Sequence, residues 1–527
     1  MIRALPRRPP RALTSLGLAL LSVPLAADTA GAGGLDYPGP GTRALGRAAA
    51  FAARGDDAMA LSYNPALIGL GGRPSLLVNS HLAFFDACVQ RSGTYSDNVT
   101  VRDRSRFGDS ELLPGAGGYA LEAFPRVCNT GPPIPAPAIV LSLPLGPRFG
   151  LGFGLLLPAN TGAVQWGDRD GTVRGLRGEL RPNPLRYLSL SAGGFALSPS
   201  AGVSWQATPW LRVGATLQWG IFSLDGVSYG VTTGGENPSL DGRARIRGSD
   251  RFVPAAIAGL HLKPTPALEL AATLRWSDDL RGTADIDMRF GDYGSSEPGS
   301  SVPTDSRLRD LSLRFPMPWQ LTAGVRYVSR QATVGEAARS RTARDALRDE
   351  RWDIELDAVF ERNSRVDEVV LRPPADLTLT TRQLLTDGTL LTLDVPVDNA
   401  FRVPRGWKDQ LSLRLGGDYT VARGLCALRG GLSYETRGLD PALANLDFLP
   451  VQRLGLHLGG TLRLNRRIDL SLAYAHLYQE RLEVPPAGSP GGARLAQMSA
   501  DGSGRVINAG TFRSHWDIFS LGANYVF

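Results

Sequence analysis

The chain has 527 residues, of which 43% are hydrophobic and 20% are charged, and its formal net charge is +7. This length suits about two or three soluble domains or one large barrel. Four arginines and one aspartate lie in the leader described next, so the charge without it falls from +7 to +4. The basic balance therefore does not indicate a nucleic-acid partner.

Residues 1–32 have the pattern of a secretory signal peptide. Arginines precede an apolar run from Leu13 to Ala27, and Ala30-Gly31-Ala32 provides small residues for cleavage before Gly33. The run is shorter than the roughly 20 residues that a spanning helix needs. We expect cleavage, and an uncleaved anchor is the alternative.

Residues 33–73 follow no strand pattern and are predicted to form a compact plug. The segment is rich in small residues and contains the acid pair Asp56-Asp57 and the motif Asn64-Pro65-Ala66-Leu67. Pro65 disfavours the helical conformation at Asn64 and indicates a turn between short helical pieces.

Residues 74–527 contain repeated segments of alternating polarity. In the stretch 210–219, for example, Leu217 and Trp219 share one face with other apolar residues, and Thr216 and Gln218 share the opposite face. This period of two is typical of transmembrane β-strands, which turn apolar side chains to lipid and polar ones to the lumen.

We count fourteen such segments, near 75–87, 134–145, 148–167, 185–205, 208–226, 251–264, 266–290, 308–332, 350–372, 408–422, 424–438, 450–465, 467–484 and 511–527. An even number allows an antiparallel barrel to close without an open edge. Short polar turns alternate with long loops, except that the link 333–349 is long where a short periplasmic turn is expected. The predicted fold is an all-β, 14-stranded antiparallel transmembrane β-barrel whose N-terminal plug lies inside the lumen.

The last strand ends at an aromatic residue. Phe519, Leu521, Tyr525 and Phe527 share one face, which resembles the C-terminal signature read by the outer-membrane assembly machinery. Together with the leader, this pattern predicts a multi-pass protein of the bacterial outer membrane. A soluble β-sandwich is the alternative.

The order of these features resembles the FadL/TodX family of outer-membrane transporters for long-chain fatty acids and aromatic hydrocarbons. The resemblance covers nearly the whole mature chain and rests on the motif 64–67, Arg73-Pro74, Pro316-Met317-Pro318-Trp319, Gly406-Trp407-Lys408-Asp409 and the end from Asn508 to Phe527. It implies capture of a hydrophobic compound from outside and lateral release into the bilayer. Implied partners are hydrophobic small molecules, outer-membrane lipid, lipopolysaccharide and the assembly machinery, with the protein a monomer and no nucleic acid involved.

The family places a kink of the third strand at an opening in the wall. By position, Pro158, Asn160 and Gly162 are the lateral-gate residues here, because Pro158 cannot donate to a ladder and Gly162 permits a bulge. An ordinary loop start at Pro158 is the alternative.

Apolar residues near the third long loop are the predicted substrate contacts: Trp166, Leu176, Leu180, Leu185 and Tyr187. They favour a channel for hydrophobic compounds over a general polar porin, which needs an open lumen. Arginines at 174, 177 and 181 lie among them, where a carboxylate substrate would find a cation.

Three cysteines fit an oxidising compartment. Cys88 and Cys128 lie at the two ends of the first long loop, so we expect one disulfide, with free thiols as the alternative. Cys426 is left inside a strand.

Enzyme motifs are weak, and we expect no catalytic residue, cofactor or metal. His457 lies on the predicted lumen face, where a polar barrel residue is the ordinary interpretation. Gly150, Gly152 and Gly154 lie in a strand and are interpreted as room for the plug. An outer-membrane hydrolase is the less favoured alternative.

Overall fold

The computed structural model describes residues 39–95, 119, 121–157, 164–168, 171–175, 178–230, 241–290, 301–303, 306–330, 345–384, 390–396, 400–498 and 504–527. The predicted leader lies outside the described residues.

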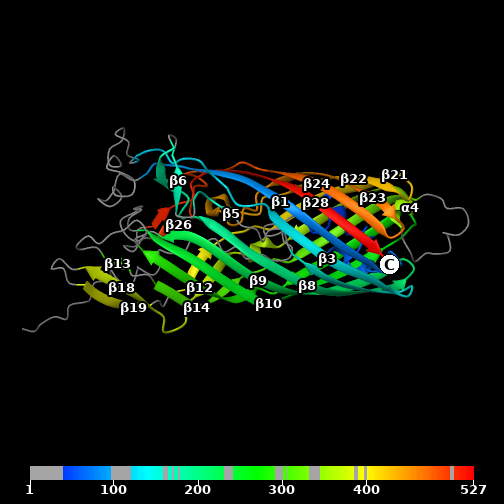
Figure 1. Ribbon diagram of the computed structural model, residues 1–527, viewed down its shortest axis with the longest axis horizontal. Helices are drawn as coiled ribbons and strands as arrows, with labels where there is room; N and C mark the ends of the chain where they lie inside the picture. The colour runs from blue at the N-terminus through cyan, green and yellow to red at the C-terminus, as the bar shows by residue number, and fades with distance from the viewer. Residues whose placement is uncertain are drawn as a thin grey trace, which may run out of the picture.

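A closed antiparallel barrel of fourteen strands forms the wall (Figure 1), as predicted. Four of these strands are interrupted and carry two labels. In chain order the wall consists of β1 (Ser75–Arg91), β3 (Ile134–Leu145), β4 (Phe149–Leu156), β8 (Ser191–Thr208), β9 (Leu211–Gly230), β10 (Gly242–Leu262), β11 (Leu268–Ser277) with β12 (Leu280–Phe290), β14 (Ser306–Phe315) with β15 (Gln320–Arg330), β16 (Glu350–Glu361) with β17 (Glu368–Arg372), β20 (Phe401–Pro404) with β21 (Gln410–Ala422), β22 (Cys426–Glu435), β23 (Arg453–Asn465), β24 (Ile468–Gln479) and β28 (Gly510–Val526). The first and last strands close the barrel by pairing from Ser75 with Val526 to Arg91 with Gly510.

Shorter elements belong to the loops and the plug. The short strands are β2 (Val127–Cys128), β5 (Val164–Gln165), β6 (Thr172–Arg174), β7 (Leu180–Pro182), β13 (Ser301–Pro303), β18 (Thr378–Leu384), β19 (Leu390–Pro396), β25 (Leu482–Val484), β26 (Ala496–Met498) and β27 (Gly504–Val506). The helical pieces are α1 (Thr42–Leu45), α2 (Ala60–Tyr63), η2 (Pro65–Leu67), α4 (Ala346–Asp349), η4 (Asn363–Arg365) and η5 (Pro441–Leu443). None of the helices in the described ranges is long and apolar enough to cross a membrane.

The plug lies inside the barrel at the end where the turns are short, beside the C-terminus (Figure 1). The residues of the long link 333–349 that the structure describes also lie at this end, since the amide of Gly424 in the β21–β22 turn donates to the carbonyl of Leu347 in α4 at 2.8 Å. The long loops gather at the opposite end.

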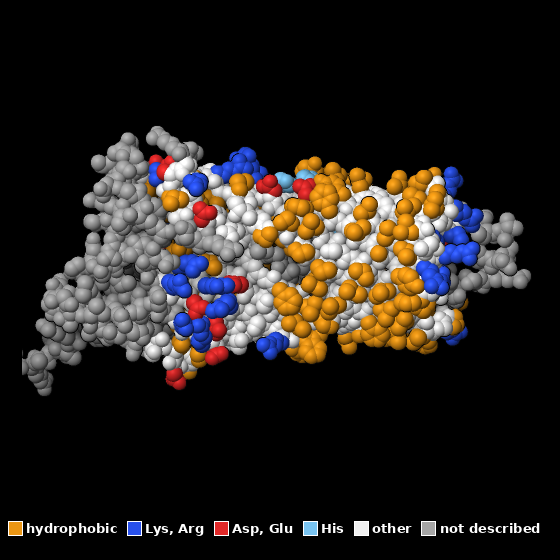
Figure 2. Space-filling view, in the orientation of Figure 1, with side chains coloured by type: hydrophobic (Ala, Val, Ile, Leu, Met, Phe, Trp, Pro, Cys, Tyr) orange, Lys and Arg blue, Asp and Glu red, His pale blue; other side chains and the backbone are white. Residues whose placement is uncertain are grey.

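An apolar belt covers the half of the barrel next to the short turns on the face seen in Figure 2, and the other strands of the wall also carry exposed apolar side chains. Outward side chains there alternate with buried ones as the period of two requires, and Leu217 on β9 and Leu458 on β23 are among the most exposed, at 69% and 64%. This face matches the surface that lipid requires of a membrane barrel.

The polarity of the two faces is reversed in the half nearer the long loops, which the sequence analysis did not predict. On β10, Arg245 and Arg247 point outward while Ala244 and Ile246 are buried. A β-bulge between Asp250 and Val253 shifts the register, so that odd-numbered residues are the buried ones in the rest of the strand. The inner face of this half is therefore apolar and its outer face is charged.

Candidate functional site

The predicted plug motif fixes the plug to the wall by hydrogen bonds. The Asn64 side chain accepts a hydrogen bond from the amide of Ala66 at 3.1 Å, and its Nδ2 donates to the carbonyls of Ala52 in the plug, at 2.8 Å, and Leu260 on β10, at 3.1 Å. Its extended backbone, with φ −149°, is the conformation that the following proline favours. One side chain thus joins two parts of the plug to the wall.

Glycines on the inner wall make room for this contact. A Cβ on Gly259 of β10 would collide with the Asn64 side chain, and a Cβ on Gly214 of β9 would collide with the Pro65 backbone. The predicted role of the β4 glycines is confirmed, because a Cβ at Gly150 would meet the Ile68 carbonyl and one at Gly154 would lie 2.7 Å from Leu61. The plug lies against bare backbone at these positions.

A buried ion cluster joins the other side of the plug to the wall. The Arg47 guanidinium contacts Asp353 on β16 at 2.9 Å and Asp418 on β21 at 2.7 Å. The Arg54 guanidinium contacts Asp353 at 2.6 Å, as does that of Arg326 on β15. Since these side chains are almost fully buried, each charge depends on its partners for stabilisation.

Backbone amides of the plug complete this attachment. Phe51 and Ala52 both donate to the Asp357 carboxylate, at 2.9 and 3.1 Å, and Ala53 donates to that of Glu355 at 2.6 Å. The alternating acids of β16 therefore all face the plug. Sequence reasoning missed the cluster, although an Asp-x-Glu-x-Asp pattern on one face of a strand was the available signal.

The acid pair of the plug is paired internally. Burial alone would raise the pKa of Asp56, but the guanidinium groups of Arg43, 2.8 Å away, and of Arg54 outweigh it and hold that pKa well below its usual range. For Asp57, burial prevails over Arg43 and raises the pKa. Asp56 is therefore a stable carboxylate that links two segments of the plug.

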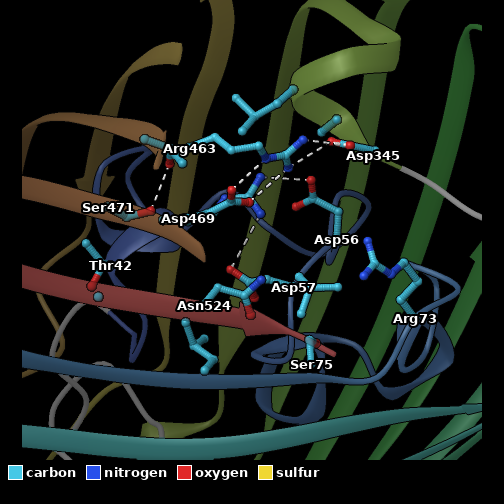
Figure 3. Close-up of a pocket in the computed structure, with 18 of the residues that line it drawn as sticks. Thr42, Asp56, Asp57, Arg73, Ser75, Asp345, Arg463, Asp469, Ser471 and Asn524 are labelled. Atoms are coloured by element: carbon cyan, nitrogen blue, oxygen red, sulfur yellow. Dashed lines mark hydrogen bonds and ion pairs between the residues drawn. The ribbon is translucent and has the colours of Figure 1, made fainter. Parts of the chain in front are cut away.

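A polar cavity of about 130 Å³ lies between the plug and the wall at the short-turn end (Figure 3). Arg463 of β23 points across it to Asp469 and to Asp345, which precedes α4, at 2.7 and 2.8 Å. Thr42, Asp56, Asp57, Arg73 and Asn524 also line it. Such charged walls suit water and ions rather than hydrocarbon.

The inner face of the opposite half carries a large apolar cluster. It includes the predicted contacts Trp166, Leu185 and Tyr187, all fully buried, together with inward residues of β9, β10, β12 and β14. Leu180 does not join them, because it lies on the exposed side of β7 and is 43% exposed. Leu176 lies outside the described residues.

Two of the arginines predicted near these contacts, Arg174 and Arg181, have partners of their own, and Arg177 lies outside the described residues. Arg181 forms an ion pair with Glu122 at 3.0 Å, and Arg174 donates to the carbonyl of Gly178 at 3.1 Å.

Strands β4 and β8 pair beside this cluster, from Phe149 with Trp205 to Leu156 with Ser198, and Val164 of β5 pairs with Ala192 of β8. The predicted gate residues Pro158, Asn160 and Gly162 lie in the intervening stretch, outside the described residues.

Cys88 and Cys128 form a disulfide that joins the paired strands β1 and β2, where the sequence predicted a bridge. Cys426 has a free thiol.

His457 contacts the plug, since its ring nitrogens lie 2.9 Å from the Leu45 carbonyl and 3.1 Å from the Ser433 hydroxyl. No group of three or more His, Cys, Asp or Glu side chains in the described ranges is arranged to hold a metal ion.

Solved structures of similar shape exist at low sequence identity. A FadL homologue of Pseudomonas aeruginosa is 15% identical, with a TM-score of 0.65, and the match covers 93% of this chain and 99% of that one. The toluene transporter TodX of P. putida is 16% identical, with a TM-score of 0.54 and the same coverage. The monoaromatic hydrocarbon channel CymD is 15% identical, with a TM-score of 0.52 over 93% and 98% of the two chains.

This chain has the FadL-type fold. The sequence itself matches no family profile and no curated protein. The assignment of the fold therefore rests on the similarity of the three-dimensional structures.

Proposed function

We propose that this protein is an outer-membrane channel for the uptake of hydrophobic compounds such as long-chain fatty acids or aromatic hydrocarbons. The compound is captured in an apolar pocket and released sideways into the bilayer. The single observation that carries the proposal is the division of the lumen into a half filled by a bonded plug and a half with an apolar inner face.

The membrane placement follows from the outer surface. The apolar belt spans the bilayer, the short turns face the periplasm and the long loops face outside, as in bacterial barrels generally. The plug then closes the periplasmic half, and the apolar cluster lies on the external side.

The apolar inner face favours a hydrophobic cargo. Binding sites for small apolar molecules are lined mainly by hydrophobic and aromatic side chains, and transfer from water to such a surface is favourable. The transporters of toluene and of monoaromatic hydrocarbons that share the fold fit the same class of cargo.

Lateral release fits the polarity of the two exit routes, one along the plug into the periplasm and one through the wall into the bilayer. Passage along the plug would lead a hydrophobic compound past the charged cavity around Arg463 and Asp56, which is unfavourable. An opening in the wall between β4 and β8 would instead lead the compound directly to the acyl chains of the bilayer. We place the gate at Pro158, Asn160 and Gly162.

The alternatives have less support. A general porin needs an open polar lumen, whereas here Arg47 and Asn64 bond the plug to several strands. A hydrolase needs a base directed at its substrate, whereas the ring of His457 is held against a plug carbonyl. We therefore assign a transport role without catalysis.

A double variant tests lateral release. Pro158→Val with Gly162→Val restores strand-compatible residues and should abolish uptake of a labelled long-chain fatty acid and of toluene by cells that depend on this protein. The control is Pro264→Val with Pro266→Val, the same kind of change in an exposed short turn, which should leave uptake intact. A heat-modifiable gel band verifies that each barrel folds. Uptake at the original rate in the folded double variant would contradict release through the wall.

A further inference from the structure

Outward-facing arginines gather on the long-loop side of the apolar belt. Figure 2 shows the charged band, and on β10, β12 and β14 its exposed or half-buried arginines outnumber the acids Asp285, Asp287 and Asp310. Several arginines are matched within the band, for example Arg247 by Asp287 and Arg309 by the same carboxylate.

Two exposed arginines, Arg251 of β10 and Arg281 of β12, lie at the edge of the belt. The pairing of β10 with β12 ends at Ser249 with Thr283, and beyond it the Arg281 amide donates to the Asp250 carboxylate at 2.8 Å, which places Arg281 beside the residue that precedes Arg251. Arg281 has Asp278 at 3.8 Å, and Arg251 has no ion-pair partner in the described part of the chain. Like charges on neighbouring strands repel each other unless an anion lies between them.

Two exposed aromatic side chains lie next to Arg251. Trp219 and Phe252 are 52% and 60% exposed, and their rings meet edge to face at 5.4 Å. The Trp219 indole donates to the carbonyl of Arg251 at 2.6 Å, which fixes the two residues at one level. Aromatic residues at this position mark the boundary between hydrocarbon and headgroups in membrane barrels.

We propose that Arg251 and Arg281, with the hydroxyls of Ser249 and Thr283 beside them, bind a phosphate group of an outer-leaflet glycolipid such as lipopolysaccharide. Guanidinium groups bind phosphate through paired charge-assisted hydrogen bonds. The acyl chains of the same lipid lie over Trp219, Phe252 and Leu217 in the belt. The site depends on the membrane placement and not on what passes through the lumen.

Lipid retention by the full-length protein tests this site. Protein purified from outer membranes is exchanged into detergent containing lipopolysaccharide or enzymatically dephosphorylated lipopolysaccharide, and bound lipid is measured by native mass spectrometry. Wild type should retain the phosphorylated form. Arg251→Gln with Arg281→Gln should retain at least about tenfold less, the effect expected on losing two charge-assisted contacts.

The control variant is Arg148→Gln with Arg467→Gln, which removes two exposed arginines at the short-turn end and should retain lipid like wild type. A heat-modifiable band verifies folding of each variant. Equal retention by the Arg251/Arg281 variant, an equal loss in the control, or indifference to the phosphate would each overturn the site. Any of these results would leave the transport proposal unchanged, since uptake is measured separately.

Discussion

At the scale of single residues, two neighbouring glycines of one strand face opposite sides of the wall, because a strand presents alternate residues to opposite faces. On β22, a Cβ at Gly431 would lie 2.5 Å from the Arg47 carbonyl carbon and 2.7 Å from the Ala48 amide of the plug. A Cβ at Gly430 would have no neighbour closer than 3.8 Å. The plug therefore requires glycine at 431 and not at 430.

This difference gives a matched pair of variants. Gly431→Val should displace the plug from the wall and raise single-channel conductance in a planar bilayer, because the valine side chain and the plug backbone would occupy the same space. Gly430→Val should conduct like wild type. Equal traces for the two variants would show that the plug does not lie against β22.

At the scale of elements, the plug is held together by the pairing of Arg43 with Asp56. Because the folded protein lowers the pKa of Asp56, this carboxylate stabilises the plug fully above its ordinary pKa, near 4. The contribution is lost as the pH falls further toward the lower pKa of the folded state. Asp57 contributes with the opposite sign, since its pKa is raised.

Asp56→Asn isolates the first contribution. At pH 7 the variant should be less stable than wild type by about 2 kcal/mol, the usual scale for a charged hydrogen bond. The difference should shrink as the pH is lowered below about 4. The stability difference is measured by unfolding the plug in urea and monitoring its cleavage by a protease. The control is Asp225→Asn, which removes the acid of the exposed pair with Arg245. A difference that grew in acid would contradict the assignment.

At the scale of the whole molecule, the fourteen-stranded wall could be predicted from sequence because period-two alternation is local, and the C-terminal strand with Phe519 and Phe527 repeats it. The plug motif at Asn64 was also recognisable. The ion cluster of Arg47 with Asp353 could not be recognised as a cluster, since the two residues are brought together only by the closed barrel.

The alternating pattern likewise did not predict the apolar inner face of the half nearer the long loops. A bulge near Asp250 changes which residues of β10 face inward, and a one-residue shift reverses the assignment of every later side chain. Sequence alternation alone therefore predicted one polarity for the whole lumen, whereas the structure has two.

Uptake measured side by side for hydrophobic and polar solutes tests the central claim most directly. Cells in which this protein supplies the only added outer-membrane route are given a labelled long-chain fatty acid, labelled toluene or a labelled sugar, with cells lacking the protein as the reference. The plugged, apolar lumen predicts faster entry of at least one hydrophobic compound and no change for the sugar. Faster entry of the sugar without any gain for the hydrophobic compounds would contradict the account and indicate a general porin.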